Sequence, residues 1–184
     1  MVKKSEQKII VAPQSYVSLS EIAIEVRKMA KKLGFTQGPY FDVVRFYEYF
    51  HSKIPEKFQF HIVDQSELPD QTHEGLTKPN GEILIPEDVY HGALDDDGRP
   101  RFTMSHELGH WLLHRESFGF ARANQNVPRY QCPEWQANTF GSFVLMPVSA
   151  VIKSNQCPNA LIERCKVSYA AAKVRCDIYE ERKI

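Results

Sequence analysis

Residues His106-Glu107-Leu108-Gly109-His110 decide the expected fold, because they place two imidazoles and one carboxylate on consecutive turns of one predicted helix. Residues four apart on an α-helix lie roughly 6 Å apart along its axis and on nearly the same face. Both imidazoles can therefore reach one small cation, and zinc accepts neutral histidine nitrogens at about 2.0–2.1 Å. Glu107 lies beside the first ligand, where it can hold a water molecule without occupying the metal. The pattern is typical of zinc hydrolases and favours a peptidase.

The residues on either side of this motif favour a helix. No helix breaker directly precedes the motif, and the segment from Trp111 to His114 is compatible with a helix. The nearest prolines are Pro100 and Pro128, so we predict a helix from about Phe102 to Arg115. The five residues alone leave one alternative open, an amphipathic core helix whose histidines are merely hydrogen-bonded.

Length, charge and cysteine pattern predict one compact cytoplasmic domain. The chain has 184 residues, and its 23 Lys and Arg balance 23 Asp and Glu, so net charge predicts neither a nucleic-acid nor a membrane partner. No window approaches the roughly 20 apolar residues of a membrane span, and Ile9 to Ala12 is too short for a signal-peptide core. The four cysteines have no zinc-ribbon spacing and are expected to be reduced.

The predicted elements alternate between helices and a short β section, which gives an α+β fold in a single domain, 1–184. N-terminal helices occupy 1–56, the sheet and the zinc-site helices 57–147, and a small helical segment 148–184. In the first part, Ser18-x-x-Glu21 reads as a capping box for a helix that ends at Gly34. A second helix is predicted from Asp42 to Lys53, where it stops before a proline.

The β section is predicted from alternation and from turn residues. Phe58, Phe60 and Ile62 alternate with polar residues, Pro79-Asn80-Gly81 is a turn signal, and 83–85 is a short apolar strand. That strand is either an ordinary sheet strand or an edge that holds an extended peptide. A turn at 95–98 then precedes the histidine helix. Later helices are predicted at 133–145, 148–153, 159–165 and from Ser168 to about Glu181.

A catalytic zinc normally has a third protein ligand and leaves its fourth position for water. The histidine-rich metzincin pattern is excluded, because Leu113 and Glu116 stand where it needs glycine and histidine. Glu134 fits instead, at the start of a predicted helix in which the small Ala137 would allow close packing on the first helix. Two alternatives stay open. Glu134 could merely stabilise the dipole of its own helix, and Glu116 is a competing carboxylate.

Further residues near the motif are candidates for supporting roles. His114 continues the stripe one turn beyond His110, but one helix cannot easily aim three imidazoles at one ion, so a supporting or packing role is expected. Asn138 could orient a ligand through a hydrogen bond. The candidate donors to a developing oxyanion are Tyr90, Tyr130, Tyr169 and His51.

These residues resemble the ImmA/IrrE family of metallopeptidases. The matching segments are Arg101 to His114, Glu134 to Gly141, and Leu145-Met146-Pro147. The segment from Lys166 to Tyr169, together with Arg175, is similar to the family's closing helical segment. The resemblance covers roughly Thr72 to Ile178. Among the departures, Gly141, Ser142 and Ser105 stand where alanine is more usual.

The resemblance implies a thermolysin-like, gluzincin site: a small mixed or antiparallel sheet packed on a helical core, with a zinc helix followed by a ligand helix. Carried over by position, His106, His110 and Glu134 would bind Zn²⁺ and Glu107 would be the catalytic base. The family further implies cleavage of a helix-turn-helix repressor, which induces a mobile element, a prophage or a stress regulon.

Two other readings compete with a peptidase. One is a non-proteolytic zinc-containing partner, or a toxin–antitoxin-like component, that binds a repressor. Retention of Glu107 argues against it, since zinc binding alone does not need this residue. The other is a DNA-binding module, which is disfavoured because the basic residues of the C-terminal helix are interleaved with acidic ones.

Overall fold

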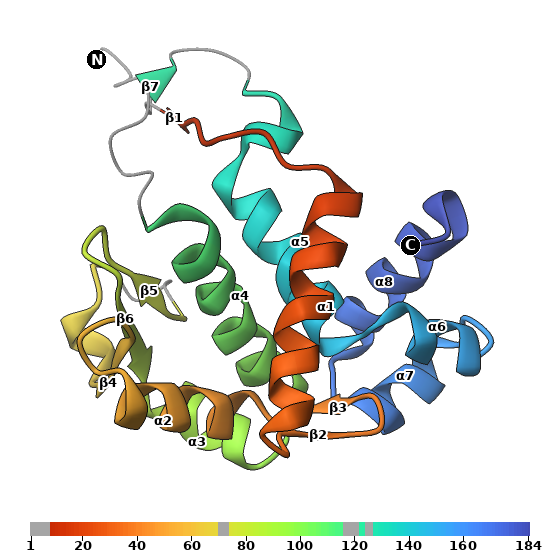
Figure 1. The fold of residues 1–184 in the computed structure, drawn as a ribbon, viewed down its shortest axis with the longest axis horizontal. Helices are drawn as coiled ribbons and strands as arrows, with labels where there is room; N and C mark the ends of the chain where they lie inside the picture. The colour runs from red at the N-terminus through yellow and green to blue at the C-terminus, as the bar shows by residue number, and fades with distance from the viewer. Residues whose placement is uncertain (1–7, 70–73, 116–121, 124–126) are drawn as a thin grey trace.

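Two antiparallel helices, α4 (Gly98–His114) and α5 (Pro133–Leu145), lie at the centre of the computed structural model, which describes residues 8–69, 74–115, 122–123 and 127–184 (Figure 1). Small residues let them approach closely. A Cβ atom on Gly109 would lie 3.0 Å from the Ala137 Cα, and one on Gly141 would lie 3.3 Å from the backbone nitrogen of His106. The close packing expected at Ala137 is therefore present.

The histidine helix begins earlier than predicted, at Gly98 and not at Phe102. Asp97 is its N-cap, and the Asp97 carboxylate accepts a hydrogen bond from the Arg99 N–H at 3.1 Å. Pro100 falls in the first turn, where its missing N–H would have no partner within the helix. The proline therefore does not set the start of this helix, and the turn predicted at 95–98 supplies the cap.

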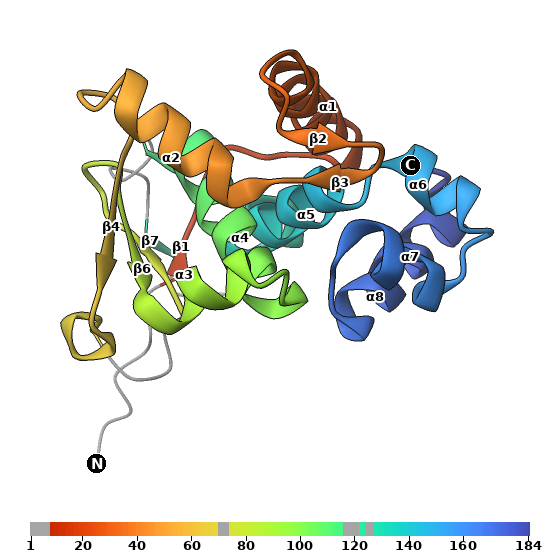
Figure 2. The same cartoon turned by 90° about the horizontal axis from the view of Figure 1, so that it is seen from below.

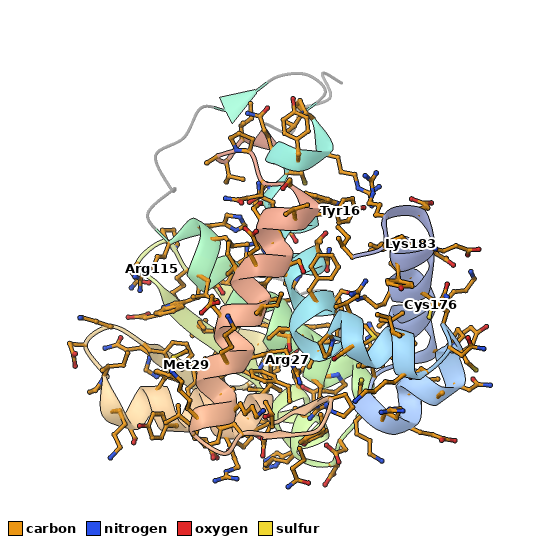
Figure 3. The ribbon with its side chains drawn as sticks, turned by 45° about the vertical axis from the view of Figure 1, so that its right-hand side comes forward. Tyr16, Arg27, Met29, Arg115, Cys176 and Lys183 are labelled. Atoms are coloured by element: carbon orange, nitrogen blue, oxygen red, sulfur yellow. The ribbon has the colours of Figure 1, made fainter. Side chains whose placement is uncertain are left out.

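α1 (Tyr16–Lys32) packs along α5, and Arg27 reaches across to donate a hydrogen bond to the Val144 carbonyl at 2.7 Å (Figure 3). The capping box predicted at Ser18 is wrong. Ser15 is the N-cap, its side chain accepts from the Ser18 N–H, and the Ser18 side chain accepts in return from the Ser15 N–H. Serine at both positions makes the box, so the helix starts one turn earlier than the glutamate signal suggested.

A three-stranded mixed sheet lies on one side of α4 (Figure 2), and its strand order is β4-β6-β5. β4 (Gln59–Val63) runs parallel to β6 (Glu82–Pro86), and β5 (Leu76–Thr77) is antiparallel to β6. The predicted α+β class and mixed sheet are confirmed. The alternation fails at Ile62, which is 44% exposed, whereas the Tyr47 and Tyr90 rings cover Phe60.

Helices α2 (Val43–Lys53) and α3 (Glu87–Leu94) connect the sheet to α4. The helix from Asp42 to Lys53 was predicted, and the structure makes Asp42 its N-cap; α3 was not predicted. α3 is short and contains Gly92, which weakens a helical pattern. A Cβ atom at Gly92 would lie 2.7 Å from the Pro100 Cγ, so the close approach of α3 to α4 favours glycine there.

The remaining elements complete the two ends of the chain. They are β1 (Lys8–Ile9) paired with β7 (Arg122–Ala123), β2 (Thr36–Gln37) paired with β3 (Tyr40–Phe41), η1 (Gln65–Glu67), η2 (Arg129–Gln131), α6 (Val148–Lys153), α7 (Pro158–Cys165) and α8 (Tyr169–Arg182). Helices α6, α7 and α8 agree with the sequence prediction to within a residue or two. The end of α8 meets the start of α1, where Arg182 stacks on the Tyr16 ring at 4.5 Å.

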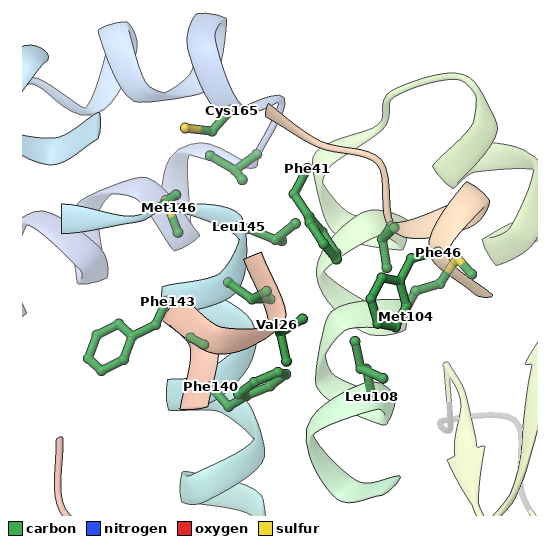
Figure 4. Packing of buried hydrophobic residues seen from close by; sticks show 14 of the residues in the cluster. Val26, Phe41, Phe46, Met104, Leu108, Phe140, Phe143, Leu145, Met146 and Cys165 are labelled. Carbon is green, nitrogen blue, oxygen red and sulfur yellow. The ribbon is translucent and has the colours of Figure 1, made fainter. Parts of the chain in front are cut away.

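One apolar cluster fills the space between α4, α5 and their neighbours (Figure 4). Met104 and Leu108 of α4 face Phe140 and Leu145 of α5, and all four are fully buried. Val26 of α1 closes the cluster from outside. The apolar face of α4 thus holds the helix in place, and the opposite face is left for polar side chains. Among the described residues, no helix is both long and apolar enough to cross a bilayer.

Candidate metal centre

Three side chains converge where the second half of α4 passes the first turn of α5. The Nε2 atoms of His106 and His110 lie 3.0 Å apart. The two carboxylate oxygens of Glu134 each lie 3.3 Å from one of these nitrogens. One possible ligand atom from each of these residues lies within 4.8 Å of the other two, so the three side chains could hold one metal ion.

The far side of each imidazole also has a partner. His106 Nδ1 lies 3.0 Å from the Asn138 Oδ1, and His110 Nδ1 lies 3.0 Å from the His114 Nδ1. When the δ nitrogens donate in these hydrogen bonds, both ε nitrogens present lone pairs to each other and to a carboxylate. Three acceptors then face one point, which a cation satisfies. Two imidazoles and a carboxylate with one position left open are the donor set of a catalytic zinc site.

The charges around this point favour a cation. The imidazoles of His106 and His110, each 3.3 Å from a Glu134 oxygen, hold the pKa of the Glu134 carboxyl well below its usual value. Burial by itself lowers the pKa of His106, but the neighbouring carboxylates of Glu134 and Glu107 outweigh burial and raise the pKa overall. In contrast, burial lowers the pKa of His114 to about 4, so this imidazole is neutral at neutral pH.

Glu107 lies beside the three convergent residues and is only 5% exposed. The Thr77 hydroxyl on β5 donates a hydrogen bond to the Glu107 Oε2 at 2.7 Å, while the Glu107 Oε1 lies 4.0 Å from the His106 Nε2. A Cβ atom on Gly75 would lie 2.9 Å from the Glu107 Cγ, so the chain before β5 passes directly over this side chain. Neither contact could be predicted from the sequence, because Thr77 and Gly75 belong to no motif.

The supporting roles suggested for His114 and Asn138 have structural counterparts, since each contacts one imidazole of the pair. Gln136 is a further member that sequence reasoning missed. Its side chain is 1% exposed and its Oε1 lies 2.9 Å from the His114 Nε2. Its place two residues after Glu134, on the buried side of a predicted helix, was the available signal. The competing carboxylate Glu116 lies outside the described residues.

The four candidate oxyanion donors are not equally placed. The Tyr90 hydroxyl donates to a glutamate of α2, and the His51 Nδ1 accepts from a strand N–H. Tyr169 starts α8, whose N-terminus packs against Gly98 at the end of α4 remote from the convergent residues. Tyr130 lies in η2, directly before the first turn of α5, and is 51% exposed.

Comparison with known families agrees with this geometry. The profile of the IrrE N-terminal-like domain, a peptidase family, matches residues 69–177, which is more than half of the chain. The chain belongs to this family. The IrrE N-terminal-like match includes β6, α4 and α5, which carry or surround the convergent residues. No curated protein matches the sequence.

Membership of the IrrE N-terminal-like family confirms the resemblance drawn from the sequence. It indicates a metallopeptidase and implies a metal cofactor. The roles of individual side chains are not part of that comparison. The assignment of His106, His110 and Glu134 as ligands and of Glu107 as base therefore stays a prediction, and so does zinc as the metal.

Proposed function

We propose that this chain is a zinc-dependent endopeptidase in which His106, His110 and Glu134 bind the zinc and Glu107 is the general base. The observation that carries this proposal is the convergence of three acceptors beside a buried carboxylate with one oxygen held and the other free. Membership of a peptidase family supports the reaction class.

A bound zinc ion would supply a Lewis acid that polarises a peptide carbonyl and makes water more acidic. The chain's own residues move the proton. Glu107 accepts it at Oε1 as water attacks the carbonyl carbon, and then donates it to the leaving amine, a transfer typically worth about 10²–10⁴ in rate. Thr77 keeps Oε2 occupied throughout, so the same oxygen faces the reacting water.

Negative charge that develops on the carbonyl oxygen needs a donor, and Tyr130 is the candidate best placed to supply one. Its exposed ring lies in the segment next to Glu134, and the described contacts of the other three candidates direct them elsewhere. Replacement Tyr130→Phe should lower kcat by up to about 10²-fold with little change in KM, as for the loss of one oxyanion donor. An unchanged kcat would remove Tyr130 from the mechanism.

The proposed substrate is a helix-turn-helix repressor, cleaved in the cytoplasm so that the genes it silences are induced. This part rests on the resemblance to the ImmA/IrrE family, and no direct contact between this chain and nucleic acid is proposed. A regulator that binds a repressor without cutting it would have no use for a buried, oriented Glu107, so peptide hydrolysis is the function best supported.

The decisive experiment compares new protein N-termini by mass spectrometry in host cells that express wild type or Glu107→Gln, with bound zinc measured on both proteins. Glutamine keeps the size of Glu107 and can still accept from Thr77, but it cannot take up the proton. We expect a few cuts that appear with wild type alone, and equal zinc in the two proteins. Identical N-termini with zinc fully bound would favour a binding protein and overturn the proposed activity.

The ligand assignment has its own test. Glu134→Ala should weaken zinc affinity by more than the roughly 10–100-fold that loss of a supporting residue causes. Affinity is measured by competition with a chromophoric chelator, with Asn138→Ala as the matched control one turn away on the same helix. Zinc affinity that is equal in the two variants would move the third ligand elsewhere, and Glu116 would be tested next.

A further inference from the structure

The orientation of one buried amide fixes the positions of the hydrogens behind the metal centre. The Gln136 Nε2 lies 2.8 Å from the Ala12 carbonyl oxygen and 2.7 Å from the Tyr130 carbonyl oxygen. A carbonyl oxygen can only accept, so the amide atom between these two carbonyls must be the NH₂ group. The Gln136 Oε1 must then face the other way, toward His114.

The orientation of Gln136 determines one hydrogen on His114. The Gln136 Oε1 is an acceptor and lies 2.9 Å from the His114 Nε2, so that nitrogen carries a hydrogen. The His114 Nδ1 lies 3.0 Å from the His110 Nδ1, and one of these two nitrogens must donate to the other. The two possible donors lead to opposite states of the metal ligand.

If His114 donated, the hydrogen of His110 would sit on Nε2, the nitrogen that lies 3.0 Å from the His106 Nε2 and 3.3 Å from the Glu134 Oε1. If His110 donates, its Nε2 carries a lone pair directed at the same point. Only this second arrangement leaves His110 able to bind a cation, since a ligating imidazole nitrogen must be free of hydrogen.

We propose that His114 and Gln136 are positioning residues that hold His110 in its metal-binding tautomer, through an ordered chain of hydrogen bonds. The chain runs from the carbonyls of Ala12 and Tyr130 to Gln136, from Gln136 to His114, and from His114 to His110. This inference rests on the proposed metal-binding role of His110 and goes beyond it, because it assigns the acceptor for a ligand hydrogen to a second imidazole.

This chain of hydrogen bonds is anchored in a part of the fold that is distant in sequence from the histidine motif. Val11 N–H donates to the Gln131 carbonyl at 3.1 Å, and Gln14 N–H donates to the Tyr130 carbonyl at 2.9 Å. These bonds fasten the segment before α1 to η2, and they hold the two carbonyls that orient Gln136. His114 is 3% exposed, so neither nitrogen of its ring exchanges its protein partner for bulk water.

Two substitutions at His114 separate its two nitrogens. Asparagine places a carbonyl oxygen near the position of Nδ1, where it can accept from His110, but it cannot reach Gln136. Glutamine places its amide near the position of Nε2, where it can donate to Gln136, but it leaves His110 without an acceptor. Glutamine also fills more of the space of the lost ring, so a residue that served packing alone would tolerate glutamine better.

We therefore expect His114→Gln to weaken zinc binding about 10–100-fold and His114→Asn to weaken it by much less. Zinc affinity is measured by chelator competition, and thermal unfolding of the metal-free variants checks that both fold. A His114→Asn protein that binds zinc no better than His114→Gln would overturn the proposal.

The tautomers of His110 and His114 can be measured directly in the wild-type protein, so the proposal can be tested even if a variant fails to fold. Two-bond proton–nitrogen spectra of protein with nitrogen-15 histidine should place the His110 hydrogen on Nδ1 and the His114 hydrogen on Nε2 alone. A hydrogen on the His114 Nδ1 or on the His110 Nε2 would overturn the proposal.

Neither the zinc-affinity measurement nor the tautomer measurement needs a substrate. Zinc bound with these tautomers but no proteolysis would therefore refute the proposed activity alone, and reversed tautomers in an active peptidase would refute this inference alone.

Discussion

Thr77 shows how one residue outside any motif can set the chemistry of a residue inside it. Its hydroxyl has a single hydrogen and lies 2.7 Å from the Glu107 Oε2 and 3.1 Å from the Glu107 backbone oxygen. A carboxylate oxygen is a stronger acceptor than a backbone carbonyl oxygen, so the hydrogen goes to Oε2. Thr77 is 8% exposed, so a rotation of the Glu107 carboxylate away from Thr77 would break a buried hydrogen bond and cost free energy.

Thr77→Val should lower kcat by between about tenfold and hundredfold, because valine has the same shape but leaves the Glu107 carboxylate free to turn away from the reacting water. KM and zinc content should stay at the wild-type values, since neither depends on the hydroxyl. Thr77→Ser restores a hydroxyl and should recover most of the rate. Steady-state kinetics on a substrate identified by the comparison of new N-termini measure both variants, and a Thr77→Val enzyme with wild-type kcat would refute the role of Thr77.

At the scale of the elements, the separation between α4 and α5 is what brings Glu134 within reach of the two histidines. Gly109 and Gly141 occupy the contact, where side chains of ordinary size would separate the helices. The two positions differ in how much room they have. A Cβ atom at Gly109 would meet the Ala137 backbone at 3.0 Å and the Phe140 ring at 3.1 Å, whereas the nearest atom to one at Gly141 lies at 3.3 Å.

Gly109→Ala should lower the free energy of unfolding by roughly 1–3 kcal/mol and weaken zinc binding, because α5 must move away and take Glu134 with it. Gly141→Ala is the control. Its contact is looser, and alanine gains up to about 1 kcal/mol in helix propensity, so its stability should stay close to wild type. Urea unfolding of the metal-free proteins and chelator competition measure the two effects. Equal behaviour of both variants would show that the helix separation does not control the site.

Across the whole molecule, buried arginines join segments that share no secondary structure. Arg101 is fully buried, and it donates to the Phe41 carbonyl at 2.8 Å and to the Lys166 carbonyl at 3.0 Å. Its guanidinium also stacks on the Tyr40 ring at 4.3 Å. One side chain thus ties the first turns of α4 to the β2–β3 hairpin and to the end of α7, at the opposite end of α4 from His110.

Arg101→Leu should lower the free energy of unfolding by about 3–5 kcal/mol, because hydrogen bonds to a charged group contribute roughly 1.5–3 kcal/mol each and their carbonyl acceptors would stay buried. Arg99→Leu is the matched control on the same helix. Its side chain is 75% exposed and its ion pair with Glu74 is worth about 1 kcal/mol or less. The folded fraction of Arg101→Leu should still bind zinc. A loss of stability no larger than that of Arg99→Leu would contradict the anchoring role.

Local signals in the chain predicted most elements and the convergent residues. The pair His106 and His110, the proline that starts α5 and the Ser168 cap of α8 each act within one or two helical turns, so they can be read in sequence order. The failures have physical causes too. Ser15 caps α1 with a serine partner where a glutamate was sought, and α3 contains a glycine that only its packing against α4 explains.

By itself, the sequence determined that one helix would present two imidazoles and a carboxylate, that a second helix would follow with Glu134 in its first turn, and that a mixed α+β fold would surround them. The tertiary structure alone decided that Thr77 would hold Glu107 and that Gln136 would link His114 to the carbonyls of Ala12 and Tyr130. The first set depends on spacing along one helix, which the order of residues fixes. The second depends on hydrogen bonds between segments far apart in the chain, whose partners meet only when the whole core is packed.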